Sequence, residues 1–86
     1  MFKIKAADGT NNLCGKRISQ LRKVKGLSQR KMATRMQLSG FDVDHYFIRR
    51  VENGERFVTD IDLVIFAKAL EVPVSEILSA EDVELL

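Results

Sequence analysis

The spacing of its apolar residues constrains the fold of this chain more than any other feature. Over residues 13–25, apolar side chains follow one another at helical intervals, at Cys14, Ile18, Leu21 and Val24. Steps of three and four residues put such side chains on one face of an α-helix. Only one proline interrupts the chain, and a length of 86 residues allows a single domain. We therefore predict an all-α protein, a compact bundle of about five short helices.

Polar and glycine residues mark where the first two helices begin and end. The side chain of Asn11 or Asn12 could cap the first helix, and Gly26 stands where a left-handed stop is expected. Ser28 is a favourable N-cap for a second helix over residues 29–37. Because the connection between them is short, the two helices are expected to pack at an angle.

Similar signals delimit a third and a fourth helix. Their expected boundaries are Asp44 as the cap of residues 45–53, Gly54 as the stop, and Thr59 and Asp62 as a capping-box pair before residues 60–70. The side chains expected to face the core from the second helix onwards are Met32, Ala33, Met36, Phe47, Ile48, Val51, Leu63, Val64, Ala67, Leu70, Ile77 and Leu78.

The helical pattern of the middle of the chain is interrupted toward the C-terminus and absent from the first residues. Pro73 breaks the helical pattern, and Ser75 could cap a short fifth helix. The second and third expected helices are joined by a tight turn with apolar anchors, which is helix-turn-helix geometry. We therefore predict three parts: a flexible N-terminal arm over 1–12, a helix-turn-helix domain over 13–78, and a short C-terminal tail over 79–86.

The charges are distributed unevenly along the chain. The net charge is only +2, yet residues 1–35 carry +9, residues 36–56 carry −1 and residues 57–86 carry −6. A polarity of this kind is typical of a protein whose basic end meets a nucleic acid or a membrane surface.

Several classes of protein are not expected. One Cys and one His provide neither an internal disulfide nor an ordinary zinc site, so no cofactor or metal is predicted. No apolar run approaches the length of a membrane span, and the first residues lack the features of a signal peptide, so a cytoplasmic, nucleoid-associated location is expected. The sequence offers no recognisable catalytic set of a nucleophile, a base and a group that orients the base. The protein is therefore not expected to be an enzyme, and no small-molecule substrate is predicted.

Specific segments add a family resemblance to this pattern. They are Gly15-Lys16-Arg17-Ile18, Leu21-Arg22, Gly26-Leu27-Ser28-Gln29, Ile48-Arg49-Arg50-Val51-Glu52-Asn53-Gly54, and Leu63 with Ala67, Ala69 and Leu70. Together they resemble the XRE-type helix-turn-helix family, which includes Cro and the phage repressors. The resemblance covers about residues 13–78 and implies the lambda-repressor-like fold.

The resemblance also assigns roles to individual residues. It implies that the third helix reads bases in the DNA major groove with His45, Tyr46 and Arg50, with Arg49 close by. It implies that the DNA backbone meets Gln29, Asn53 and Arg56, with Lys16, Arg17, Arg30 and Lys31 as additional contacts. It further implies a structural salt bridge between Arg22 and Glu52.

Some residues allow another interpretation. Tyr46 could pack on Phe41 in the turn, and Arg49 and Arg50 could form an ordinary solvated face. Cys14, like the two inward methionines, is expected in the core. The connection over residues 37–44 is longer than the tightest turn of the family, so the second and third helices could meet at a different angle.

The sequence favours a regulator of transcription that binds double-stranded DNA, acting as a repressor. Because one small module buries little surface on DNA, a homodimer is expected. Its candidate interface is formed by the fifth helix and the tail, with Val74, Ile77, Leu78, Val83, Leu85 and Leu86. The alternative is a protein-interaction module of the same fold, such as an antitoxin or an adaptor, but an adaptor has no need of the +9 segment.

Overall fold

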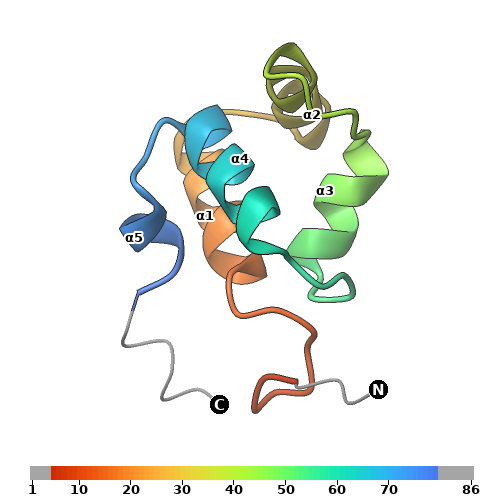
Figure 1. The fold of residues 1–86 in the computed structure, drawn as a ribbon, viewed down its shortest axis with the longest axis vertical. Helices are drawn as coiled ribbons and strands as arrows, with labels where there is room; N and C mark the ends of the chain where they lie inside the picture. Colours follow the sequence, from red (N-terminus) through yellow and green to blue (C-terminus); the bar gives the residue numbers. More distant parts are fainter. Residues whose placement is uncertain (1–4, 80–86) are drawn as a thin grey trace.

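The structure is a computed structural model that describes residues 5–79, and helices are the regular elements of that part of the chain. They are α1 (Gly15–Val24), α2 (Gln29–Leu38), α3 (His45–Glu52), α4 (Asp60–Leu70) and α5 (Val74–Ile77). Figure 1 shows α1 and α4 in the middle, α3 on one side and α5 on the opposite side. The prediction of an all-α helix-turn-helix bundle is confirmed.

Three helices begin at the caps that the sequence predicted. The side chain of Ser28 accepts a hydrogen bond from the amide of Lys31, and that of Asp44 accepts one from Phe47. Thr59 and Asp62 form the full capping box at the start of α4. These bonds satisfy amide groups that have no partner inside a helix.

The beginnings of α1 and α5 differ from the predictions. α1 begins at Gly15, two residues later than expected, and its N-cap Cys14 makes no side-chain capping bond. The Oδ1 atom of Asn12 instead accepts a hydrogen bond from the Gly15 amide. Ser75 does not cap α5, because that helix already begins at Val74, with Pro73 as its N-cap residue.

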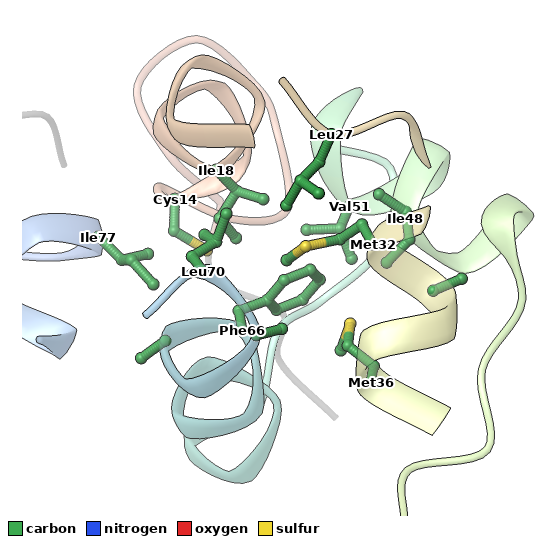
Figure 2. Packing of buried hydrophobic residues seen from close by; sticks show 13 residues of the cluster. Cys14, Ile18, Leu27, Met32, Met36, Ile48, Val51, Phe66, Leu70 and Ile77 are labelled. Atoms are coloured by element: carbon green, nitrogen blue, oxygen red, sulfur yellow. The ribbon is translucent and has the colours of Figure 1, made fainter. Parts of the chain in front are cut away.

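The core forms where α1, α2, α3 and α4 meet. Its largest fully buried side chains are Phe66, Ile18, Met32, Met36, Ile48, Leu70, Ile77 and Val51. Figure 2 shows the ring of Phe66 reaching from α4 toward Met32, with Leu70 and Ile18 beside it. Cys14 and both methionines of α2 are buried, as predicted.

Two predictions of inward-facing residues are wrong. Val24 is 83% exposed, because it ends α1 just before the chain turns away toward α2. Val64 is 44% exposed, while Phe66, which the sequence pattern did not single out, is fully buried. Since α4 is apolar around much of its circumference, the spacing alone did not define its inner face.

The connection between α2 and α3 is compact despite its length. Gly40 has a φ of 86°, and the amide of Phe41 donates to the carbonyl of Met36. The ring of Phe41 then packs edge-on against Phe47, which stacks on Phe66. Tyr46, for which packing on Phe41 was the alternative, has the ring of His45 as its neighbour instead.

Candidate nucleic-acid interface

One face of α3 lies away from the core and carries two aromatic and two basic side chains. Ile48 and Val51 are fully buried and fix the rotation of the helix about its axis. The opposite side carries the four predicted base-reading residues, His45, Tyr46, Arg49 and Arg50, which we call the α3 face. Both arginines are exposed, and His45 is half-buried.

The beginning of the α3 face is an aromatic pair. The rings of His45 and Tyr46 have centroids 4.2 Å apart and are tilted by 34°. Tyr46 is 54% exposed, so its ring remains accessible from outside. The pair holds two bulky side chains at the amino end of α3, where the capping group Asp44 fixes the direction of the helix.

The amino end of α2 lies beside the carboxyl end of α3. The Nε2 atom of Gln29 donates a 3.2 Å hydrogen bond to Oε1 of Glu52. Arg30 and Lys31 occupy the same first turn of α2 and are exposed. The free amide groups and the partial positive charge of a helix amino end attract anions, so these residues and the helix end reinforce one another.

A buried ion pair ties these helices to α1. Arg22 Nε lies 2.7 Å from Glu52 Oε2, and Arg22 Nη2 lies 3.0 Å from Oε1. The third nitrogen, Nη1, donates to the carbonyl of Leu27 at 2.7 Å. The side chains of Arg22 and Glu52 are only 10% and 6% exposed, so the structure joins the two residues that the resemblance paired.

The turn after α3 carries the next two predicted backbone contacts, Asn53 and Arg56. Both are exposed, and Gly54 between them has a φ of 76°, a conformation that glycine adopts without strain. The guanidinium of Arg56 lies over the ring of Phe47, 4.6 Å from its centroid. Contact of this kind favours one position of the charged group.

The remaining two basic residues, Lys16 and Arg17, lie on different sides of α1. Lys16 lines a hollow of about 230 Å³ together with Asn53 and Gly54, and its ammonium lies 3.7 Å from Asp8. Bonds from the Thr10 hydroxyl and amide, with the charge of Lys16, hold the pKa of Asp8 below its ordinary value. Arg17 instead lines a hollow with residues of α5, so the structure does not bring it to the turn after α3.

The sequence interpretation missed the role of Asn11 and Asn12. They were assigned to a flexible arm and to helix capping, yet both side chains donate to carbonyl groups between Val51 and Arg56. The signal in the sequence was two adjacent asparagines, whose amides can donate and accept at once. Their partners lie about 40 positions away, so no local pattern could identify them.

Within residues 5–79, no group of three or more His, Cys, Asp or Glu side chains is arranged to hold a metal ion. None of the helices in that range has the length and apolar character needed to cross a membrane.

Comparison with known proteins identifies relatives among solved structures. No protein-family model and no curated protein matches the chain. A hypothetical transcription factor, NHTF, from Neisseria has 19% identity and a TM-score of 0.68, with 100% of this chain and 95% of that one covered, and it supports the fold. The restriction-modification controller protein C.AhdI from Aeromonas hydrophila has 35% identity and a TM-score of 0.65, with 77% of this chain and 92% of the controller covered.

The second of these relationships is close enough to define a family. More than a third of the aligned residues are identical, and the alignment includes nearly the whole of the controller. The chain therefore belongs to the same family as the restriction-modification controller protein C.AhdI.

Proposed function

We propose that this protein is a sequence-specific repressor that inserts α3 into the major groove of double-stranded DNA. The observation that carries the proposal is the α3 face: four polar side chains directed outward from a helix whose opposite side is locked in the core. An α-helix fits the major groove of B-DNA, where each base pair presents a distinct set of donors and acceptors.

Base recognition is assigned to the α3 face. Arg49 and Arg50 lie in the last turn of α3 and can each donate two hydrogen bonds to the O6 and N7 atoms of a guanine. The rings of His45 and Tyr46 offer an apolar surface for a thymine methyl group, together with polar atoms for a base edge.

Contact with the DNA backbone is assigned to the residues around the α3 face. At one side are Gln29, Arg30 and Lys31 at the amino end of α2. At the other are Asn53 and Arg56 in the turn after α3, with Lys16 near that turn. Such contacts set the register of the protein on the duplex and carry no sequence information themselves.

The regulator is proposed to act as a homodimer. A single module of this size contacts one half-site, and a dimer reads two half-sites about 34–36 Å apart. Of the interface residues expected from the sequence, Ile77 is buried in the core, Val74 and Leu78 are half-buried, and Val83, Leu85 and Leu86 lie outside the described residues. Exposed apolar side chains on and before α4, at Phe57, Ile61 and Val64, are the better candidates.

The relationship to C.AhdI favours a narrower second candidate. That protein is a restriction-modification controller, and it is 35% identical to this chain. Control of restriction-modification genes is therefore a specific form that the proposed regulation could take. Selection of bound sequences from random duplex would distinguish the two, because it yields the operator motif and its symmetry.

The experiment that tests the main proposal measures binding to random duplex over a range of salt concentrations. Affinity should fall steeply as salt rises, because basic residues displace counterions from the phosphates. Arg50→Ala should reduce discrimination among sequences by about 1–3 kcal/mol, whereas Gln29→Ala should weaken binding to all sequences alike. A protein that ignores duplex DNA at low salt would refute the regulator and favour the protein-interaction alternative.

A further inference from the structure

The segment that precedes α1 is fastened to the turn that follows α3. The amide of Asn11 donates to the carbonyl of Gly54 at 2.8 Å, and its side-chain Nδ2 donates to the carbonyl of Glu55 at 2.8 Å. A Cβ at Gly54 would lie 2.6 Å from Cγ2 of Thr10, so the segment also packs closely on the turn. Figure 1 shows this segment passing beneath the carboxyl end of α3.

Asn12 makes the central connection in this contact. Its Nδ2 donates to the carbonyls of Arg56 at 2.8 Å and Val51 at 3.1 Å, while its Oδ1 accepts from the Gly15 amide at 2.8 Å. All of the donors of the amide are therefore used, together with its acceptor. Aspartate would present oxygen to two carbonyl oxygens, and glutamine would be one methylene too long.

Asn12 adds a second hydrogen bond to a carbonyl at the end of α3. The Val51 carbonyl already accepts from the Gly54 amide at 3.0 Å, and the Asn12 side chain donates to the same oxygen. Gly15 brings α1 so near that a Cβ there would collide with the Val51 carbonyl oxygen. The side chain of Asn12 therefore joins the start of α1, the end of α3 and the turn in one place.

Arg56 is held from two sides as a result. Its carbonyl accepts from Asn12, its amide donates to the carbonyl of Arg50 at 3.3 Å, and its guanidinium rests over the ring of Phe47. A side chain whose backbone and charged group are both fixed loses less conformational entropy when it binds.

We infer that Asn12 is a positioning residue for DNA binding, acting through Arg56. The inference rests on the proposed function, and it assigns the segment before α1 a part in orienting a phosphate contact that lies some 40 residues later in the chain. Without the Asn12 side chain, the turn loses its direct tie to the start of α1, and Arg56 keeps only the Arg50 carbonyl and the Phe47 ring as partners, so more of its ordering falls to DNA binding.

A double-mutant cycle on DNA affinity tests this coupling. In the unmutated protein, Arg56→Ala should weaken binding about tenfold and lower the slope of log affinity against log salt by about one. Asn12→Ala should produce most of the same loss. In the Asn12→Ala background, Arg56→Ala should then cost less than about threefold, because the contact is already impaired.

A stability control separates positioning from general destabilisation. Ile77→Ala removes a core side chain on the opposite side of the molecule from α3, so it lowers the melting temperature without touching the turn. Measured well below the melting temperature of each variant, Ile77→Ala should leave the salt slope unchanged. If Asn12→Ala should fail to fold, Asn11→Ala removes one bond of the same contact and should show a smaller coupling in the same direction.

The remaining outcomes are equally decisive. An Arg56→Ala cost that is the same in both backgrounds would overturn the role of Asn12 alone, as would an Arg56→Ala variant that binds normally. Absence of duplex binding by the unmutated protein at low salt would overturn the proposed function together with this inference.

Discussion

The two ends of the helical bundle are stabilised by different interactions. Around the carboxyl end of α3, directional polar bonds dominate: Arg22 to Glu52, Gln29 to Glu52, and Asn12 to the turn. In the region of α4 and α5, which we call the α4–α5 region, burial of apolar side chains dominates, with Phe66, Leu70 and Ile77 at most 1% exposed.

The difference suggests how the bundle divides stability from positioning. Apolar burial is strong but not directional, so it stabilises the fold without fixing atoms to a fraction of an ångström. Hydrogen bonds and ion pairs add less net stability but specify geometry. The proposed phosphate contacts of Gln29, Asn53 and Arg56, and the proposed base contacts of Arg49 and Arg50, lie beside the polar end, where precise geometry is needed.

The largest effect is expected in the α4–α5 region. Phe66→Ala should lower the free energy of unfolding by about 3–5 kcal/mol, because it leaves a cavity in the centre of the core. Urea denaturation measures this loss. Leu38→Ala is the control, since Leu38 is 84% exposed and its removal should cost about 1 kcal/mol or less. Equal losses from the two variants would contradict the assigned core.

Breaking the ion pair at the carboxyl end of α3 measures how much the polar interactions there contribute to stability. Arg22→Ala leaves the Glu52 carboxylate buried without its partner, so the free energy of unfolding should fall by about 3 kcal/mol. Thermal and urea denaturation provide the measurement. An unchanged melting midpoint would refute a structural role for this pair.

A double variant sharpens that result. Arg22→Met combined with Glu52→Met replaces the pair by apolar side chains and should recover much of the lost stability. It also removes the partner of Gln29, so affinity for all DNA sequences should remain lower than in the unmutated protein. If DNA affinity recovers along with stability, the polar network contributes nothing to positioning.

Local signals in the sequence predicted most of the fold. Ser28, Asp44 and Thr59 cap helices because their side chains bond to amides three residues later, a relation that the sequence contains directly. Gly26 and Gly54 end helices with positive φ for an equally local reason. The burial of Met32 and Ile48 followed from helical spacing.

Contacts between distant segments could not be predicted in the same way. Asn12 reaches the carbonyl of Arg56, but nothing near either residue indicates the other. Val64 and Phe66 were misjudged because the apolar residues of α4 surround the helix, and only the neighbouring helices decide which of them is buried. The pairing of Arg22 with Glu52 came from the family resemblance and has no local signal.

The capping box of α4 offers a smaller test. Thr59→Ala removes the acceptor for the Asp62 amide and should lower the free energy of unfolding by about 1 kcal/mol. Thr59→Ser retains the hydroxyl and should stay close to the unmutated protein. Because α4 belongs to the α4–α5 region, the salt dependence of DNA binding should be unchanged in both variants. A changed slope of log affinity against log salt would contradict the separation of stability from positioning between the two ends.

The smallest expected effect is a gain in stability at the end of α4. Glu71 caps that helix with φ 58° and ψ 44°, a left-handed conformation that costs a non-glycine residue about 1–2 kcal/mol. Glu71→Gly removes this strain and a negative charge at the negative end of the helix, but it also makes the unfolded chain more flexible. The net gain should be about 0.5 kcal/mol, seen as a rise of about 2–4 °C in melting temperature.

Glu76→Gly, placed within α5, should have the opposite sign, because glycine weakens a helix interior. A lower melting temperature for Glu71→Gly would mean that the Glu71 side chain stabilises the α4–α5 region by more than its backbone strain costs.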